Sequence, residues 1–294
     1  MTDRAVAVTR CGALTTVQDL GRAGLAHLGV PRSGALDLPA HRLANRLVGN
    51  PPGAATLETT LTGCALRPRC PVTVAVTGAP SPVTVDGRPA PWGAAVRVPA
   101  GAELVVGPAT AGVRGYLAVG GGVAVPPVLG SRATDLLSGL GPPPLADGQV
   151  LPLGPPGAPP PAADAVPHPA PPAVLSLRLR PGPRDDWFPA DALDLLARGD
   201  YQVASASNRV GLRTAGPPLR RAPHAEGAEL PSEGMVLGAV QLPPDGRPVV
   251  FLADHPTTGG YPVIGVVPEA DLAAAAQAAP GTPVRFLPRG APRR

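Results

Sequence analysis

Short apolar runs separated by turn signals dominate the first half of the chain. Between residues 72 and 119 the alternation of apolar and polar positions predicts five β-strands. These predicted strands cover residues 72–76, 83–85, 95–98, 103–106 and 113–119. No helical pattern of ten or more residues alternates with them, as a parallel α/β fold would require. The pattern therefore favours a β-barrel or a β-sandwich.

One helix is predicted before these strands, near residues 37–48. Asp37 is of the residue type that caps a helix N-terminus, Pro39 fits the first turn, and Gly49 follows the end. Leu43 and Leu47 share one face, which we expect to cover one mouth of a barrel. The polar residues on the other face are interpreted as solvated. They are His41, Arg42, Asn45 and Arg46.

A proline-rich stretch divides the chain in two. Proline donates no backbone hydrogen bond, so residues 154–173 are predicted to form a semi-extended linker. We expect an N-terminal β domain of residues 1–153 and a C-terminal β domain of residues 174–294. In the C-terminal domain the pattern predicts helices near residues 190–198 and 269–279 and strands around residues 235–242 and 248–253.

Composition excludes several chemistries. All 25 basic residues are arginine. Without lysine the chain cannot form a Schiff base, complete a phosphate-binding loop of the G-x-x-x-x-G-K-[ST] type or carry covalent biotin. The net charge of +4 is modest for 294 residues, which disfavours nucleic-acid binding. No zinc-hydrolase motif or paired C-x-x-C motif occurs, so no metal site is predicted.

The cysteine content and the hydropathy of the sequence indicate in which cellular compartment we expect the protein. Cys11, Cys64 and Cys70 are odd in number and fit neither a zinc ribbon nor a redox pair, so we interpret them as reduced thiols. The sequence has no run of 18 apolar residues and no apolar signal segment after Met1. We therefore expect a cytoplasmic protein that is not attached to a membrane.

The densest group of polar and hinge residues follows the predicted strand at residues 248–253. Asp254 opens this segment and Tyr261 lies near its end. A rigid strand would present such residues at its end, so we place the candidate chemistry here. The alternative is a polar hairpin whose Asp and Thr side chains bond to their own backbone.

Several motifs occur in a consistent order along nearly the whole chain. They cover residues 16–24, 27–37, 44–50, 120–122, 129–134, 207–211, 232–234, 238–243 and 248–262. In these motifs the chain resembles the family of 5-oxoprolinase C subunits, also called the biotin-dependent carboxyltransferase or allophanate hydrolase subunit 2-like family. The resemblance implies a mainly β protein with two tandem cyclophilin-like β-barrel domains and a few short helices.

The resemblance also implies a function and partners. Relatives act as the C subunit of an ATP-dependent 5-oxoprolinase, beside a homologous B subunit, with an A subunit completing the enzyme, and open the lactam of 5-oxoproline to L-glutamate. ATP would act at the level of that complex. One alternative is the carboxyltransferase component of a urea-carboxylase-like biotin enzyme. Another is a non-catalytic regulator that binds a kinase inhibitor similar to the B subunit. Both enzyme interpretations imply a small amide or lactam substrate.

Within this framework the residues suggest roles. Asp254 and His255 are candidates to hold or deprotonate a nucleophile, and Tyr261 to donate to a developing oxyanion. Arginine side chains bind phosphate or carboxylate groups through paired hydrogen bonds. Glycines allow backbone N–H groups to approach a developing oxyanion. The predicted substrate-binding residues are Asn208, Arg209, Arg213, Glu233, Gln241, Thr257, Thr258, Gly259 and Gly260.

Structural alternatives stay open for several of these residues. Arg209 could be a solvated guanidinium in a turn, and Glu233 could be a cap. Gln18, Asp19 and Arg22 fit an Asx-turn with a surface ion pair as well as they fit a ligand contact.

Three positions depart from the family pattern at the candidate site. His255, Pro256 and Val263 stand where many relatives have Arg, Gln and Lys. These differences from the family pattern are compatible with an altered substrate range or with a loss of activity.

Overall fold

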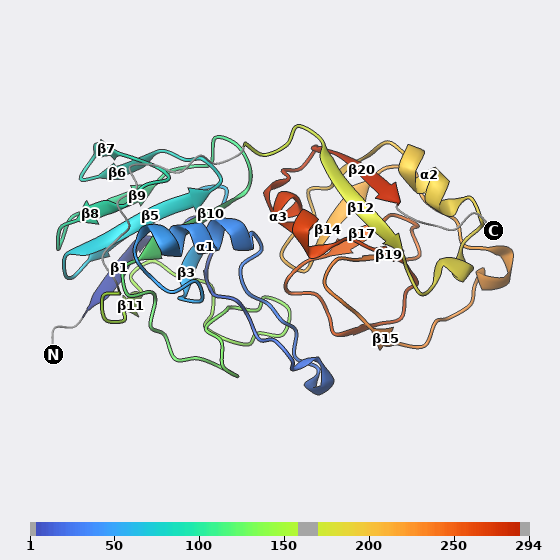
Figure 1. The fold of residues 1–294 in the computed structure, drawn as a ribbon, viewed down its shortest axis with the longest axis horizontal. Coiled ribbons are helices and arrows are strands. Elements are labelled where there is room, and N and C mark those ends of the chain that lie inside the picture. The colour runs from blue at the N-terminus through green and yellow to red at the C-terminus, as the bar shows by residue number, and fades with distance from the viewer. Residues whose placement is uncertain (1–3, 158–169, 289–294) are drawn as a thin grey trace. The chain divides into compact units, whose positions relative to one another are not determined.

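The computed structural model describes residues 4–157 and 170–288, which form mainly β-strands with three α-helices (Figure 1). The predicted mainly β fold with a few short helices is confirmed. Two compact units are present. The N-terminal unit contains residues 1–22, 33–135 and 139–171, and the C-terminal unit contains residues 23–32, 136–138 and 172–294. Residues 158–169, most of the predicted linker, lie outside the described residues.

The N-terminal unit is built from two antiparallel sheets. The first contains, in spatial order, β11 (Val150–Pro152), β1 (Ala5–Arg10), β4 (Cys64–Pro68), β9 (Leu104–Val106), β6 (Val83–Val85) and β7 (Arg88–Ala90). The second contains β2 (Thr15–Gln18), β3 (Thr56–Thr60), β10 (Arg114–Val119), β5 (Val72–Gly78) and β8 (Val96–Val98). Apolar residues of both sheets, such as Leu66 and Leu117, share one buried cluster. The two sheets therefore pack on each other through an apolar core.

All five strands predicted between residues 72 and 119 are observed, with ends displaced by no more than two residues. One strand, β7, was not expected, because residues 86–89 carry turn residues. Asp86 and Gly87 both have positive φ, +47° and +74°, as a two-residue hairpin turn requires. The turn is therefore short enough for β7 to pair with β6, with Pro89 on the edge strand of the sheet.

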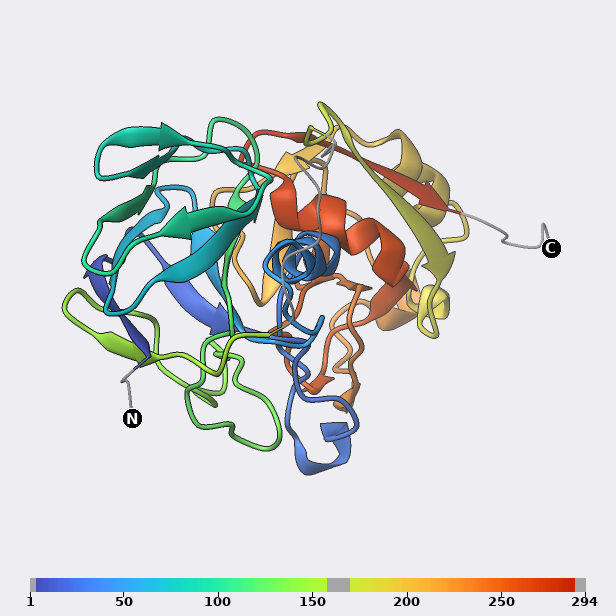
Figure 2. The same ribbon diagram turned by 60° about the vertical axis from the view of Figure 1, so that its left-hand side comes forward.

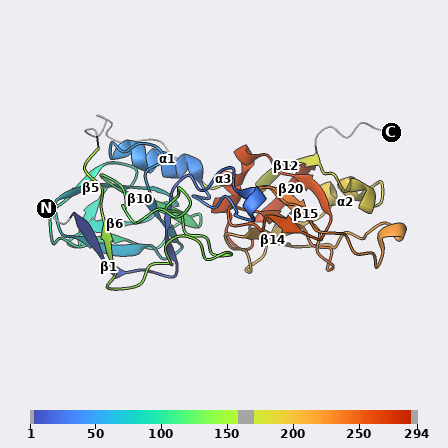
Figure 3. The same cartoon turned by 90° about the horizontal axis from the view of Figure 1, so that it is seen from below.

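The predicted helix is α1 (Leu38–Leu47), which lies across β5 and β10 (Figures 1 and 3). Its capping is as expected: the Ala40 amide donates to the Asp37 carboxylate at 3.0 Å. Ala40, Ala44 and Leu47 are buried against the second sheet. Such contacts stabilise a short helix that would be marginal in water alone.

The expectation of a solvated polar face on α1 is wrong for two of its four residues. His41 and Asn45 are fully buried, whereas Arg42 and Arg46 are exposed. The chain after α1 runs beside the helix and supplies partners: Asn45 donates to Ala54 O at 2.8 Å. The helix therefore has a second buried side that binds a loop through hydrogen bonds instead of apolar contacts.

The C-terminal unit contains a closed barrel. Its strands, in order around the barrel, are β12 (Leu175–Pro181), β19 (Val263–Val266), β16 (Ala239–Gln241), β17 (Val249–Phe251), β14 (Gly211–Ala215), β13 (Tyr201–Val203) and β20 (Pro283–Pro288). The β12–β20 pair is parallel and the other pairs are antiparallel. Closure removes the exposed edges that an open sheet would have. Outside the barrel, β15 (Glu233–Gly234) and β18 (Thr258–Gly259) pair with each other.

Both helices predicted for the second half of the chain are present. They are α2 (Ala192–Arg198), which packs on β20, and α3 (Glu269–Gln277), which packs on β12 (Figures 1 and 2). The part of the chain that the structure describes also contains three short 3₁₀ helices: η1 (Ala26–Leu28), η2 (Asp185–Trp187) and η3 (Pro223–Ala225). None of the helices in the described ranges combines the length and hydropathy that a membrane-spanning helix requires.

Candidate functional site

The candidate segment begins at the end of β17. This strand stops at Phe251, three residues before Asp254, and the chain then turns with the His255 amide donating to Leu252 O. Asp254 is fully buried and His255 is 6 % exposed. The polar-hairpin alternative does not account for Asp254, because its carboxylate bonds to Leu136 and Arg209, which are distant in sequence.

Asp254 forms a buried, bidentate ion pair with Arg209. Arg209 Nε lies 2.9 Å from Asp254 Oδ2, and Nη2 lies 2.9 Å from Oδ1. Arg209 is only 1 % exposed, so the alternative of a solvated guanidinium is wrong. The Asp254 amide donates to Arg209 O at 3.0 Å, and the Leu136 amide donates to Asp254 Oδ2 at 3.1 Å. The pair therefore joins three separate stretches of the C-terminal unit.

His255 makes a ring contact and a hydrogen bond through one ring nitrogen. Its ring stacks on Phe251, with centroids 5.9 Å apart and planes inclined by 16°. Nδ1 lies 2.7 Å from Pro256 O. Because a carbonyl oxygen only accepts, Nδ1 carries the hydrogen of this contact. These contacts thus fix the orientation of the His255 ring.

Predicted substrate-binding residues on β15 and β18 form a two-stranded ribbon. Glu233 pairs with Gly259, Gly234 pairs with Thr258, and the Met235 amide donates to Thr257 O at 2.8 Å. The Glu233 carboxylate forms an ion pair with Arg184, with Arg184 Nε 2.9 Å from Oε1. This hydrogen bond lowers the pKa of Glu233 below its ordinary value. Glu233 is therefore an ionised partner of Arg184 and unsuited to act as a general acid.

Gln241 connects the ribbon to the stretch that carries Tyr261. Its Nε2 donates to Tyr261 O at 3.3 Å. A Cβ atom at Gly259 would stand 2.9 Å from Gln241 Nε2, so a larger residue there would displace the Gln241 amide. The Tyr261 side chain itself is 43 % exposed. Gln241 thus supports the backbone at Tyr261 and leaves the phenol accessible.

Asn208 and Arg213 are two further residues that the sequence predicted to bind substrate. Asn208 Oδ1 accepts from the Val210 amide at 2.9 Å and from the Gly211 amide at 3.3 Å, so its side chain caps a turn. Arg213 is exposed on β14, and its amide donates to Ser207 Oγ. The Asn208 side chain therefore has a structural role, whereas the Arg213 side chain is exposed.

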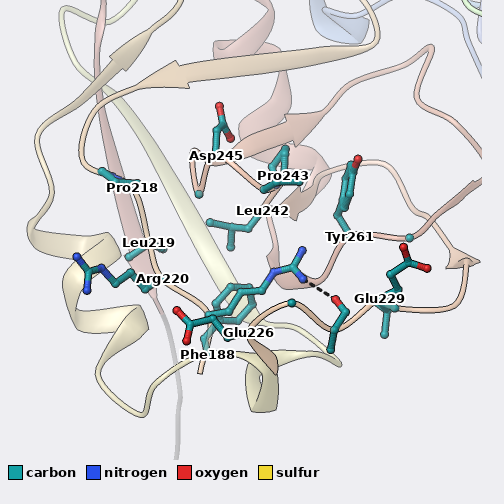
Figure 4. Close-up of a pocket in the computed structure, with 17 residues that line it drawn as sticks. Phe188, Pro218, Leu219, Arg220, Glu226, Glu229, Leu242, Pro243, Asp245 and Tyr261 are labelled. Atoms are coloured by element: carbon teal, nitrogen blue, oxygen red, sulfur yellow. Dashed lines mark hydrogen bonds between the residues drawn. The ribbon is translucent and has the colours of Figure 1, made fainter. Parts of the chain in front are cut away.

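A pocket of about 720 Å³ opens beside Gly260 and Tyr261 in the C-terminal unit (Figure 4). Phe188 and Leu242, both buried, form apolar parts of its wall. Charged lining residues include Arg220, Arg221, Glu226, Glu229 and Asp245. The volume lies within the range typical of small-molecule sites, roughly 300–1,000 Å³. Of the predicted site residues, Gly260 and Tyr261 line this pocket.

Sequence reasoning missed the charged residues of the pocket. The adjacent pair Arg220-Arg221 and the turn at residues 243–246 were the available signals. The turn overlaps a tetrapeptide that also occurs at residues 86–89, and the arginine pair falls in a stretch without strand or helix periodicity. Neither signal indicates that the two segments come together, because that contact depends on barrel closure.

The N-terminal motif at Gln18, Asp19 and Arg22 is buried in the N-terminal unit. The predicted Asx-turn is present, since the Gly21 amide donates to Asp19 Oδ1 at 2.8 Å. The predicted surface ion pair is wrong: Arg22 is 2 % exposed and donates to Val128 O and Ala133 O. Asp19 also accepts from Ser131 Oγ at 2.6 Å. These hydrogen bonds tie two loops of the unit together.

The fold and these motifs place the chain in a known family. It belongs to the carboxyltransferase family, because the model for the carboxyltransferase domain, subdomains A and B, matches residues 28–288. The chain is similar to the C subunit of 5-oxoprolinase from Escherichia coli, with 39 % identity over 95 % of this chain and 90 % of that protein. The resemblance stated from the motifs is thus confirmed.

Urea-processing enzymes are also similar. The urea amidolyase of Saccharomyces cerevisiae is 33 % identical over 97 % of this chain, but this covers only 16 % of the yeast protein. The crystal structure of the K. lactis urea amidolyase matches with a TM-score of 0.90 and 31 % identity. That match covers 99 % of this chain and 19 % of the other. The same fold therefore occurs in relatives named for two different reactions.

Proposed function

We propose that this chain is the C subunit of an ATP-dependent 5-oxoprolinase and contributes the site that holds the lactam. The observation that carries the proposal is the similarity to 5-oxoprolinase C subunits from two bacteria. The Haemophilus influenzae protein is 34 % identical over 92 % of this chain and 87 % of its own length. Together with the E. coli match, it supports one component of a larger enzyme, which acts with the A and B subunits as partners.

The pocket beside Tyr261 offers suitable chemistry for an amide. Opening a lactam places negative charge on the carbonyl oxygen, which hydrogen-bond donors stabilise. The exposed Tyr261 hydroxyl is such a donor, and the glycines at 259 and 260 allow backbone N–H groups to approach closely. His255 does not line this pocket, and we keep it as a candidate to hold a nucleophile beside it. Asp254 and Arg209 hold the stretch in place as a buried pair.

ATP would supply activation of the lactam carbonyl in the complex. The pocket residues described here do not fit a triphosphate, because Glu226, Glu229 and Asp245 line the same cavity as the two arginines. The chain also lacks the lysine of a phosphate-binding loop. We therefore assign ATP binding to a partner chain of the complex and derive no step through ATP on this chain.

A carboxyltransferase role is the second candidate. The TM-score of 0.90 with the K. lactis urea amidolyase favours it, as does the carboxyltransferase description of the family. In that role the biotin would be attached to another chain or domain, because this chain has no lysine to carry it. Urea and 5-oxoproline are both small amides, so the pocket volume alone does not separate the two substrates.

The deciding experiment uses the complete complex. The chain is co-expressed with the A and B subunits, and 5-oxoproline-dependent release of ADP and glutamate is measured. We expect turnover of 5-oxoproline and none of urea. An intact complex without 5-oxoproline turnover would overturn the proposal. Bicarbonate-dependent carboxylation of urea with a biotinylated partner would establish the second candidate instead. Binding of a protein similar to the B subunit, without either reaction, would indicate a regulator.

Replacing Tyr261 by phenylalanine is expected to lower kcat about a hundredfold, the effect typical of losing one oxyanion donor. The side chain is 43 % exposed, so we expect the stability to change by less than about 0.5 kcal/mol. ADP release by the complex measures the rate, and the melting temperature of the variant serves as the control. Unchanged turnover in the variant would remove Tyr261 from the chemistry while leaving the proposed function intact.

A further inference from the structure

Arg221 is a pocket residue held in a fixed position. Its guanidinium lies 5.5 Å from the centroid of the Trp187 ring, which favours a cation over its face. Nη1 donates to Ala228 O at 2.9 Å, the bond drawn as a dashed line in Figure 4. The backbone nearby is bonded too, since the Ala222 amide donates to Trp187 O at 2.9 Å. These contacts fix the guanidinium before any ligand arrives.

Arg221 has no ion-pair partner within the described ranges. Among the described residues, no carboxylate lies within 4.0 Å of its guanidinium, although Glu226 and Glu229 line the same pocket. The bond to Ala228 O uses one of five N–H donors, and the planar fork of arginine suits a carboxylate. Arg221 is therefore a preformed site for an anion.

The other lining residues restrict which anion fits. The acidic side chains of Glu226, Glu229 and Asp245 disfavour ligands with several negative charges, because like charges repel at short range. A small amide with a single carboxylate provides a counter-charge for Arg221 and carries only one negative charge. Tyr261 lines the same pocket and is available to the amide carbonyl. Urea has no carboxylate and would leave Arg221 without a counter-charge.

We propose that Arg221 binds the carboxylate of the substrate, and that the pocket thereby selects a lactam or amide bearing one carboxylate over neutral amides such as urea. The inference deepens the proposed 5-oxoprolinase function and rests on it for the identity of the substrate. Recognition of a charged group by a fixed guanidinium gives strong discrimination, because the analogue without that group leaves the guanidinium without an ion-pair partner.

The test compares three compounds on the full chain by isothermal titration calorimetry and, for turnover, on the complex with the A and B subunits. 5-Oxoproline carries the carboxylate, 2-pyrrolidinone has the same lactam ring without it, and urea is neutral. We expect 5-oxoproline to bind at least about 10-fold more tightly than 2-pyrrolidinone, the effect of a charge-assisted hydrogen-bonded pair. Equal binding of the two lactams by the unmodified protein would overturn the proposal without relying on any variant.

Variants then locate the effect. Arg221→Gln is expected to raise the KM for 5-oxoproline about 10-fold to 100-fold with little change in kcat, and to leave 2-pyrrolidinone binding unchanged. Arg198→Gln is the matched control, because the Arg198 side chain on α2 is 79 % exposed and its ion pair, with Asp194, stays within that helix. An unchanged KM in a folded Arg221→Gln variant would overturn the inference. If that variant still turned over 5-oxoproline in the complex, the proposed function would stand.

The 5-oxoprolinase function and the carboxylate site at Arg221 can be tested independently of each other. If the complex does not turn over 5-oxoproline, calorimetry with L-proline, which also carries a ring and one carboxylate, still tests the anion site. Binding of L-proline or 5-oxoproline that is lost in Arg221→Gln would support the carboxylate site without the reaction. Absence of binding by both carboxylates to the chain and to the complex would overturn the site itself.

Discussion

Replacing Asp254 by alanine is expected to lower the free energy of unfolding of the C-terminal unit by about 3–5 kcal/mol, because it removes the carboxylate that forms a bidentate ion pair with a buried guanidinium. Arg209 is 1 % exposed and makes a bidentate contact with the Asp254 carboxylate. The substitution also removes the acceptor of the Leu136 amide. Urea unfolding at pH 7 measures the loss. In a Trp92→Phe background, Trp187 is the remaining tryptophan and reports on this unit.

Two further variants separate this explanation from a general sensitivity of the protein. Arg209→Met combined with Asp254→Leu replaces the pair by apolar side chains and is expected to be more stable than Asp254→Ala by about 2 kcal/mol or more. Glu233→Ala removes the carboxylate of a solvent-accessible ion pair and should cost far less. A double variant as unstable as the single one would show that the charge pairing is not the cause of the loss.

The same variants decide the role of Asp254 in the reaction. The sequence suggested Asp254 as a group that holds or deprotonates a nucleophile, but its carboxylate is buried against Arg209. If the pair only positions the site, a folded double variant in the complex should retain measurable turnover of 5-oxoproline. If the carboxylate exchanges a proton with the substrate, turnover should fall to background even though the fold is recovered.

Local patterns in the sequence predicted the features that depend on local physics. The strands between residues 72 and 119 followed from alternation and turn residues, since side chains on a strand point to opposite faces in turn. The start of α1 followed from Asp37, whose carboxylate accepts from the Ala40 amide within the same turn. Such features are set by residues only a few positions apart.

Contacts between distant residues could not be predicted in this way. Arg209 and Asp254 are 45 positions apart and meet through barrel pairing of β14 with β17. His41 and Asn45 read as a solvated face, because their partners lie in the loop after the helix. Arg221 comes to Tyr261 only when the barrel and its loops close a common pocket. In each case a polar side chain is explained by a partner that periodicity does not reveal.

The buried His41 is expected to make the N-terminal unit sensitive to acid. Its Nδ1 lies 2.9 Å from Thr56 Oγ1 and its Nε2 lies 3.1 Å from Pro52 O. Burial lowers the pKa of His41 from 6.5 to about 4, against smaller raising effects of Pro52 O, Asp19 and Glu58. The unfolded chain therefore binds a proton near pH 6.5, whereas the folded unit resists it until about pH 4.

Stability should therefore be complete above pH 6.5 and fall as the pH decreases towards 4, with a loss on the order of 3 kcal/mol from this residue. Urea unfolding between pH 7.5 and pH 4 measures it, in a Trp187→Phe background where Trp92 reports on the N-terminal unit. His41→Gln should flatten the curve by about that amount. Arg46→Gln is the control, because Arg46 is exposed on the same helix and its replacement leaves His41 in place. If His41→Gln kept the slope of the unmodified protein, the carboxylates of the unit, and not His41, would account for its acid sensitivity.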